Sequence, residues 1–258
     1  MKRALVTGGA KRLGRAMALY LAERGVDVAI HYHGSAEDAE ATAAEARAKG
    51  VRAEIVQVDL LDEATTAELV PRAAQLLDGP LDLLINNASI FEYDTIRSAT
   101  RESWDRHIGS NLRAPFVLIQ HFAAQAPEAD RSGAEPKARA LVINMVDQRM
   151  RKLTPEFMTY TLAKMGLWTL TQTSAQALAP AIRVNAIGPG PTLQGARQSE
   201  EHFNRQRAAT ILERGADPAD IVAALGYFMD APAVTGQLLC VDGGQHLGWR
   251  TPDVLGPE

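Results

Sequence analysis

The sequence predicts an α/β fold: one domain over residues 1–258, with a doubly wound parallel sheet of about seven strands and helices on both faces. Short apolar, β-rich runs alternate with helical segments along the whole chain, which is typical of a parallel sheet covered on both faces. The first run leads directly into a glycine-rich turn and a helix. No internal repeat or domain boundary interrupts the alternation, and the length suits one large α/β domain.

Composition and charge exclude several classes of protein. The chain is 46% hydrophobic and 22% charged, with a net charge of −4, and it has no basic tail that would attract nucleic acid. No apolar stretch approaches membrane-spanning length and the N-terminus does not read as a signal peptide, so we expect a cytoplasmic protein without a membrane partner. The single cysteine, Cys240, excludes an intrachain disulfide, and its apolar surroundings favour a buried thiol over a nucleophile. No metal site is expected.

The N-terminal βαβ unit carries the first functional signal, the turn TGGAKRLG. The predicted strand, helix and strand of this unit lie at residues 3–7, 15–24 and 26–31. Gly8 and Gly14 would let the backbone approach a pyrophosphate at the helix N-terminus. The alternative is a plain tight turn. The spacing T-G-x-x-x-R-x-G also places Arg12 where it projects into the phosphate region.

The end of the second strand favours NADP(H) over NAD. An acidic residue at this place would bind the ribose 2′-hydroxyl of NAD. Here the strand leads into HYHGS, residues 31–35, and the first acid is Glu37. The side chains that could instead surround a 2′-phosphate are Lys11, Arg12, His33 and Ser35. The alternative is that they are solvated loop residues.

Further strands are predicted at residues 52–58, 81–85, 140–146, 182–187 and 237–241. Asp59 ends the third strand, where a carboxylate can contact an adenine, or can cap a turn or the next helix. The fourth strand leads into small residues that suit a backbone close beneath a ligand, namely Asn86, Asn87, Ala88 and Ser89. Ile90 and Phe91 then form an exposed apolar pair, which is either a stacking surface or a plug for the loop.

Helices are predicted between the strands, at residues 36–50, 62–77, 102–125, 154–179 and 217–229. Asn111 lies inside the third of these, although asparagine is disfavoured in a helix interior. It can bend the helix through a hydrogen bond, and that bond can also be its use in an active site. Residues 128–138 are polar, with glycine and proline, and predict an exposed loop.

The C-terminal part predicts the borders of a site. The stiff turn Gly188-Pro-Gly-Pro191 would hold a cofactor ring in place. Residues 192–214 are polar and charged with weak amphipathy, and we interpret them as a mobile substrate lid. The tail, residues 245–258, reads as irregular.

The central stretch, residues 140–170, carries the strongest chemical signal. Its buried strand ends at Asp147, and Tyr160 and Lys164 follow, four residues apart on one helix face. A free tyrosine has a pKa of about 10, so it is a poor acid–base catalyst near neutrality. An ammonium nearby favours the phenolate and is expected to lower that pKa. The alternative is an amphipathic helix whose Tyr160 and Lys164 face water.

Taken together, these motifs resemble the short-chain dehydrogenase/reductase family, whose members have a Rossmann-type fold. The matching residues run in order over nearly the whole chain: Thr7, Gly8, Gly14, Asn86, Asn87, Ala88, Asn111, Tyr160, Lys164, Pro189, Gly190 and Asp242-Gly-Gly244. The finer resemblance is to pteridine reductases and dihydromonapterin or dihydrofolate reductases, through TGGAKRLGR, HYHGS, NNAS-x-F, NMVD and YTLAK. That subgroup has an aspartate, here Asp147, where the family has a serine, which argues against a typical alcohol or 3-oxoacyl reductase.

The resemblance implies NADPH-dependent reduction of a C=N bond of a pteridine, in tetrahydrobiopterin or folate metabolism, by a homotetramer. The implied catalytic residues are Asp147, Tyr160, Lys164 and Asn111, with Asn111 supporting a water relay to Lys164. The implied substrate contacts are Arg12, Ser89, Phe91, Asp147 and Tyr160, with Phe91 sandwiching the pterin against the nicotinamide. The implied cofactor contacts are Gly8, Lys11, Arg12, Leu13, Gly14, His31, His33, Ser35, Asp59, Leu60, Asn87, Ala88, Ser89, Tyr160, Lys164, Pro189 and Gly190.

Some features depart from the subgroup or leave alternatives open. Gly34 stands where the subgroup often has an arginine, so one contact on the adenine side is missing. The lid carries no motif of the subgroup. A basic cluster before the central helix would attract a substrate's glutamate tail or remain solvated: Arg149, Arg151 and Lys152. Two other functions stay open, a short-chain reductase of an unrelated carbonyl or alcohol and a catalytically idle NADP-binding scaffold.

Overall fold

The computed structural model describes residues 1–195 and 198–249. They form a seven-stranded, wholly parallel sheet in the order β3-β2-β1-β4-β5-β6-β7, which confirms the predicted α/β fold. The strands are β1 (Arg3–Val6), β2 (Asp27–Tyr32), β3 (Ala53–Gln57), β4 (Leu83–Asn86), β5 (Ala140–Met145), β6 (Ile182–Pro189) and β7 (Leu238–Val241). The strand order reverses between β1 and β4, so their carboxyl ends border the crevice where such sheets bind ligands.

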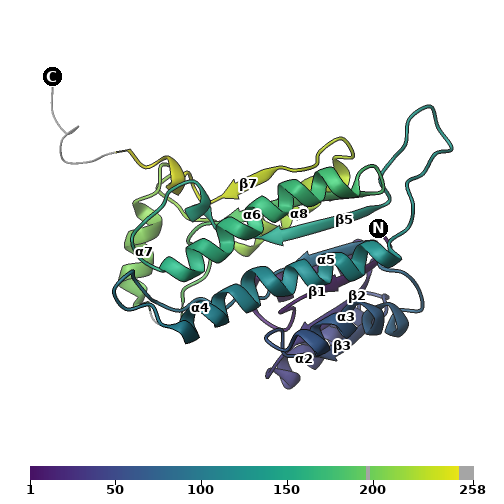
Figure 1. The fold of residues 1–258 in the computed structure, drawn as a ribbon, viewed down its shortest axis with the longest axis horizontal. Helices are drawn as coiled ribbons and strands as arrows, with labels where there is room; N and C mark the ends of the chain where they lie inside the picture. Colours follow the sequence, from purple (N-terminus) through teal and green to yellow (C-terminus); the bar gives the residue numbers. More distant parts are fainter. Residues whose placement is uncertain (196–197, 250–258) are drawn as a thin grey trace.

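Helices cover both faces of the sheet (Figure 1). They are α1 (Arg12–Glu23), α2 (Ala36–Arg47), α3 (Glu63–Leu76), α4 (Arg101–Ile108), α5 (Ala114–Gln125), α6 (Met158–Leu178), α7 (Glu200–Ala208) and α8 (Pro218–Asp230). One core lies between the sheet and α1, α2 and α8, and the other lies against α3, α5 and α6. Successive strand residues point to opposite cores, as Leu5 and Val6 do. Because both cores consist of buried apolar side chains, the strands read as continuous apolar runs.

β7 lies at the edge of the sheet and pairs only with β6, so its side chains are less covered than those of the inner strands. The side chain of Cys240 is therefore half-buried, rather than buried as the apolar sequence predicted. Even so, this partial burial is the main cause that raises the pKa of its thiol to about 11, and the charge of Asp242 adds to it. A thiol with so high a pKa is a poor nucleophile at neutral pH.

Two helix predictions and the predicted irregular tail need correction. The expected helix over 102–125 is divided by a π-helical turn, Gly109–Arg113, which contains Asn111. The central helix α6 begins at Met158 rather than near Thr154, because Phe157 adopts a left-handed conformation with φ of 55° that a right-handed helix cannot include. The tail begins with a short 3-10 turn, Gln245–Leu247, and its residues 250–258 lie outside the described part of the chain.

The predicted exposed loop between α5 and β5 is present and projects from the body of the protein at the upper right of Figure 1. A single antiparallel bridge joins Asp130 to Lys137 within it. Within residues 1–195 and 198–249, no helix has the length and hydrophobicity needed to cross a bilayer.

Phe122 should be one of the main contributors to folding stability. Its ring is fully buried in the core beneath α5, so Phe122→Ala is expected to lower the free energy of unfolding by about 3–5 kcal/mol. Phe116, on the same helix, is 38% exposed, and Phe116→Ala should cost no more than about 1 kcal/mol. Urea denaturation of both variants measures the difference, and equal losses would contradict this account of the core.

Candidate active site

The glycine-rich turn after β1 is built for close contact with a ligand. Gly8 has a φ of +60°, which favours glycine, and a Cβ at Gly14 would lie 2.1 Å from the carbonyl oxygen of Gly8. The Asn87 side chain donates to the carbonyl oxygens of Thr7 and Gly8 at 2.8 and 3.1 Å. Helix α1 begins at Arg12, so its first N–H groups, which have no partner inside the helix, face this turn. Such a helix end binds anionic groups.

Thr7 joins the two strands on either side of the point where the strand order reverses. Its hydroxyl donates to the carbonyl oxygen of Ile85 and accepts from the backbone N–H groups of Asn87 and Ala88 at 2.9 and 3.0 Å. The structure thus brings the predicted residues of the turn and of the Asn87–Ala88 segment together. Thr7 belongs to the sequence motifs of the turn, but its link between the two strands does not follow from the sequence.

His31 lies beneath the turn rather than at its surface. Its ring is 2% exposed; Nδ1 accepts from the N–H of Gly8 at 3.0 Å and Nε2 donates to the carbonyl oxygen of Val58 at 3.1 Å. Both ring nitrogens are therefore used by the protein itself. The predicted direct contact of His31 with a cofactor is corrected to support of the turn. Burial lowers the pKa of His31 to about 4, so the ring is neutral near pH 7.

Two of the residues predicted to surround a 2′-phosphate, Lys11 and His33, lie next to acidic side chains. Lys11 forms an ion pair with Asp38 at 2.7 Å, and Nδ1 of the exposed His33 lies 3.7 Å from Asp59. Asp59 also accepts from the N–H of Leu61, so it caps the turn as one of its two predicted roles requires. Ser35 precedes α2, and Leu60 packs partly buried against a core.

Arg12 reaches across the mouth of the turn. Its backbone has a φ of 53°, and its guanidinium donates to the carbonyl oxygens of Leu193 and Gln194 at 3.1 and 2.9 Å. It thus ties the turn to the first residues of the predicted lid. The lid contains α7, which has no buried residue, and residues 196 and 197 of the lid lie outside the described part of the chain.

Other predicted cofactor residues pack closely at the same edge of the sheet. Leu13 packs partly buried against the core beside α1. The N–H of Gly190, which follows Pro189 at the end of β6, donates to the carbonyl oxygen of Val241 at 3.0 Å. A Cβ at Gly190 would lie 2.5 Å from Cβ of Asp242, so only glycine fits between these segments.

The central stretch brings the predicted catalytic side chains together at the carboxyl end of β5. The Tyr160 hydroxyl donates to Oδ2 of Asp147 at 3.0 Å. Nζ of Lys164 lies 5.7 Å from the centre of the Tyr160 ring and donates to the carbonyl oxygen of Met145 at 2.7 Å. Asp147 is half-buried, whereas Tyr160 and Lys164 are buried. A phenol, a carboxylate and an amine in this arrangement can hold and pass a proton.

The pKa expected for Tyr160 is wrong in direction. Burial raises the pKa of the phenol well above its usual range, and the carboxylate of Asp147 raises it further. Lys164 does not offset this, because its ammonium is directed at the Met145 carbonyl oxygen and burial lowers its own pKa to about 8. Burial also raises the pKa of Asp147. Tyr160 is therefore held as a neutral phenol that can donate a proton.

An aromatic cluster lies beside the phenol. The ring of Phe91 stacks on that of Phe157 with centres 4.3 Å apart and planes at 9°, and it meets Tyr160 edge-on at 4.7 Å. The guanidinium of Arg149 lies 4.8 Å above the Phe157 ring. Phe91 was predicted from sequence, but Phe157 was missed, since its place depends on a left-handed backbone that the sequence does not signal. Ser89 is exposed in the same segment as Phe91.

Asn111 holds this segment in place. In the π-helical turn, its Oδ1 accepts from the N–H of Ile90 at 3.0 Å and its Nδ2 donates to the carbonyl oxygen of Ile90 at 2.8 Å. π-Helical turns are often found at functional sites. The amide of Asn111 thus binds the neighbouring segment rather than the backbone of its own helix, as a helix-bending bond would. Its role in a water relay to Lys164 stays a prediction.

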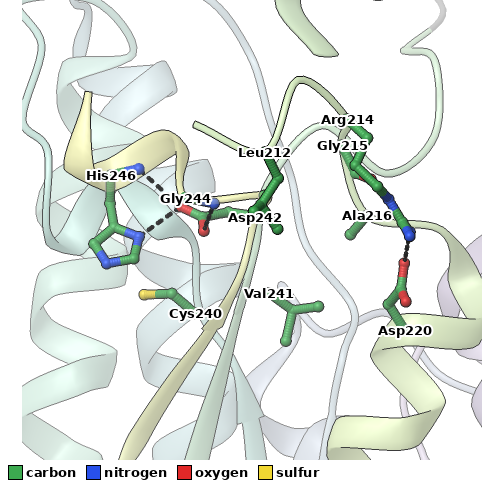
Figure 2. Close-up of a pocket in the computed structure, with 11 residues that line it drawn as sticks. Leu212, Arg214, Gly215, Ala216, Asp220, Cys240, Val241, Asp242, Gly244 and His246 are labelled. Carbon is green, nitrogen blue, oxygen red and sulfur yellow. Dashed lines mark hydrogen bonds and ion pairs between the residues drawn. The ribbon is translucent and has the colours of Figure 1, made fainter. Parts of the chain in front are cut away.

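A cavity of about 320 Å³ lies at the carboxyl end of β7, lined among others by Cys240, Asp242 and His246 (Figure 2). Asp242 is 2% exposed and accepts hydrogen bonds from the N–H groups of Gly244 and His246 and from the His246 ring. Across the cavity, Arg214 is paired with Asp220. These bonds close the Asp242-Gly-Gly244 turn, so this part of the motif is structural. In the described residues, no group of acidic, His and Cys side chains is arranged to hold a metal ion.

Comparison with known proteins agrees with this geometry. A family profile described as enoyl-(acyl carrier protein) reductase matches residues 8–246. The chain belongs to the short-chain dehydrogenase/reductase family. A curated relative, 3-oxoacyl-[acyl-carrier-protein] reductase of Staphylococcus epidermidis, is 32% identical over 251 residues, covering 95% of this chain and 99% of the relative. Membership of this family of oxidoreductases explains both the sequence motifs and the order of the strands in the sheet.

Two solved structures are also similar. Alternative dihydrofolate reductase 1 of Brucella suis, in complex with NADP, is 42% identical with a TM-score of 0.91, covering 98% of both chains. A short-chain dehydrogenase of Burkholderia cenocepacia, also with NADP, is 31% identical with a TM-score of 0.84, covering 95% of this chain and 97% of the other. The predicted family is confirmed, while the roles predicted for individual residues stay predictions.

Stability should fall in acid through His31. Its pKa is about 4 when folded and 6.5 when unfolded, so the unfolded chain binds more protons between these values and the folded state loses stability as the pH falls from 6.5 to 4. The loss from this one ring is at most about 3 kcal/mol. Denaturation of wild type and His31→Asn at pH 7 and pH 4.5 measures it, because the amide does not titrate. A constant difference between the two proteins would contradict the assignment.

Proposed function

We propose that the protein is an NADPH-dependent oxidoreductase that reduces a C=N bond of a pteridine, such as a dihydropterin, dihydromonapterin or a dihydrofolate. The observation that carries the proposal is the hydrogen bond from the Tyr160 phenol to Asp147 at the end of β5. Asp147 stands where a typical carbonyl reductase of the family has a serine. A carboxylate with a raised pKa beside a neutral phenol suits protonation of a ring nitrogen better than it suits a carbonyl oxygen.

The residues at the crevice fit NADP(H). The Gly8 and Gly14 turn leaves room that a Cβ would fill, and the start of α1 offers N–H groups to a pyrophosphate. Lys11, His33 and Ser35 would hold the 2′-phosphate, and the ion pair between Lys11 and Asp38 would have to open for this. The NADP complexes of the two similar structures support the same choice. Lys164, buried beside the phenol, would hold the nicotinamide ribose.

The reaction is the addition of a hydride and a proton across the C=N bond. When bound, NADPH supplies the hydride to the ring carbon. Tyr160 donates the proton of its hydroxyl to the ring nitrogen, and its raised pKa keeps that proton in place until then. Lys164 would stabilise the charge that the phenolate gains. Asp147, whose pKa is raised by burial, would take up a proton from water and pass it to the phenolate, which restores the hydroxyl for the next turnover.

The aromatic cluster fits a flat substrate. Phe157 supports Phe91 from one side, and the Phe91 side chain remains 44% exposed for stacking on a heterocycle. Arg12 and Ser89 would supply hydrogen-bond donors to the pterin. Arg149, Arg151 and Lys152 would attract an anionic substrate tail. A homotetramer and a place in pterin or folate metabolism remain predictions.

A second candidate is reduction of a 3-oxoacyl thioester, the activity in the name of the Staphylococcus relative. The overall identity of 32% favours it, whereas Asp147 in place of the serine opposes it. NADPH oxidation with dihydrobiopterin, dihydromonapterin and dihydrofolate on one side, and with acetoacetyl-coenzyme A and simple ketones on the other, separates the two. Turnover of the carbonyl compounds alone would overturn the pteridine proposal.

Tyr160→Phe should abolish most of the activity without loss of cofactor binding. The change removes the proton donor, so kcat is expected to fall roughly a hundredfold to ten-thousandfold. Tyr93→Phe is the matched control, because this exposed tyrosine lies in the same aromatic cluster but is not bonded to Asp147. Steady-state kinetics and NADPH fluorescence titration measure both effects, and full activity of the Tyr160 variant would contradict the assignment.

Gly34→Arg should strengthen the preference for NADPH over NADH. A Cβ at Gly34 meets no atom within 4 Å, so an arginine fits there without strain and can reach the 2′-phosphate. The ratio of kcat/KM for NADPH and NADH is expected to rise about tenfold, the effect of one exposed charge-assisted bond worth about 1.4 kcal/mol. Gly133→Arg, in the exposed loop between α5 and β5, is the control for added charge, because this glycine has room for a side chain and no left-handed backbone. An unchanged ratio would place the 2′-phosphate elsewhere.

A further inference from the structure

Residues 89–94, between β4 and α4, have no regular secondary structure, and exposed residues alternate along them with more buried ones. Every second side chain is exposed beside the aromatic cluster, and the members of this set are Ser89, Phe91 and Tyr93. The residues between them face α4, the π-helical turn and α6, and they are Ile90, Glu92 and Asp94. One side of the segment therefore faces the proposed substrate, and hydrogen bonds on the other side hold the segment in place.

His107 binds the middle of this segment through a hydrogen bond. It is fully buried in α4; its Nε2 accepts from the N–H of Glu92 at 3.1 Å, and its Nδ1 lies 2.6 Å from the hydroxyl of Thr159. A backbone N–H can only donate, so Nε2 carries no proton and Nδ1–H must donate to Thr159. The Thr159 hydroxyl in turn donates to Asp94. Burial, the main cause, lowers the pKa of His107 and keeps this neutral form.

The same chain of hydrogen bonds holds the first turn of α6. Phe157, at the N-cap, makes no side-chain cap, and its left-handed backbone separates the helix from the preceding turn. The first N–H groups are bound from a distance instead: Met158 donates to the carbonyl oxygen of Asp94 and Thr159 to its carboxylate, at 3.4 and 3.1 Å. The next residue is Tyr160, whose ring meets that of His107 edge-on at 6.0 Å.

We propose that His107 is a positioning residue for the reaction: by linking the N–H of Glu92 to Thr159, it fixes the placement of Phe91 relative to Tyr160. The proposal rests on the function proposed above, since Phe91 is the ring that stacks on the substrate and Tyr160 is its proton donor. Two side chains on separate elements, a loop and a helix, have to hold a flat ring between them and the cofactor. A buried, uncharged link between those elements removes their relative motion.

The two bonds of the histidine can be separated by substitution. In His107→Gln, the side-chain oxygen takes the place of Nε2 and still accepts from Glu92. In His107→Asn, the amide takes the place of Nδ1, which keeps the bond to Thr159 and loses the bond to Glu92. Hydrogen–deuterium exchange of the peptide over residues 89–94 should rise about tenfold in His107→Asn and stay near the wild-type rate in His107→Gln. His121→Gln, on α5, is the control.

The kinetic readout distinguishes positioning from stability. With the pteridine that wild type reduces, His107→Asn should raise the substrate KM and lower kcat/KM roughly tenfold, the effect of one lost hydrogen bond. His107→Gln should stay within about twofold of wild type, and both should bind NADPH as wild type does. Faster exchange with unchanged kcat/KM, or an equal loss of NADPH affinity, would overturn the proposal and leave the histidine a purely structural residue.

Two further measurements keep the test decisive. If His107→Asn does not fold, Thr159→Val breaks the next bond of the chain and Thr159→Ser restores it, with the same kinetic expectation. Wild type that reduces no pteridine would overturn the proposed function, a result seen before any variant is compared. The same series with 9,10-phenanthrenequinone, a planar hydride acceptor, then decides the role of His107: a tenfold loss limited to the Asn variant supports it, and equal rates overturn it.

Discussion

The hydrogen bond between the Tyr160 phenol and the Asp147 carboxylate is the constraint on which the site depends. It joins the end of β5 to the first turn of α6, thirteen residues further along the chain. β5 is fully buried between β4 and β6, so the carboxylate stands at a fixed edge. Because burial of the pair outweighs the nearby ammonium, the phenol keeps its proton. A loosely packed pair would be hydrated and would lose this property.

A second, fully buried chain of polar side chains sets the relative position of these elements. Nδ2 of Asn86 donates to Oδ1 of Asn144 at 2.8 Å, and Nδ2 of Asn144 donates to the hydroxyl of Thr171 at 2.9 Å. These residues belong to β4, β5 and α6, so one network fixes the register of two strands and the rotation of the helix above them. Buried networks of this kind specify a unique arrangement because a slip leaves polar groups unpaired.

Much of this architecture could be predicted because it follows from local signals. Continuous apolar runs gave the seven strands, and the Gly8 and Gly14 turn indicated the crevice. The features that could not be predicted depend on contacts with residues that are distant in sequence. In the sequence His107 is an ordinary helical residue, and its role depends on hydrogen bonds to Glu92 and Thr159. The left-handed backbone of Phe157 could not be predicted, because this conformation is usual for glycine or asparagine and not for phenylalanine. The pKa of Tyr160 was misjudged for the same reason, since its burial depends on packing.

The projecting loop between α5 and β5 has a practical consequence. It precedes the amino end of β5, whereas Asp147 follows the carboxyl end, so the whole length of a buried strand separates the loop from the chemistry. Its bridge between Asp130 and Lys137 closes it independently of the sheet. Exposed loop tips of this kind accept inserted sequence. An affinity tag or a fluorescent label placed between these two residues would give a handle for immobilisation that leaves the catalytic face open to solution.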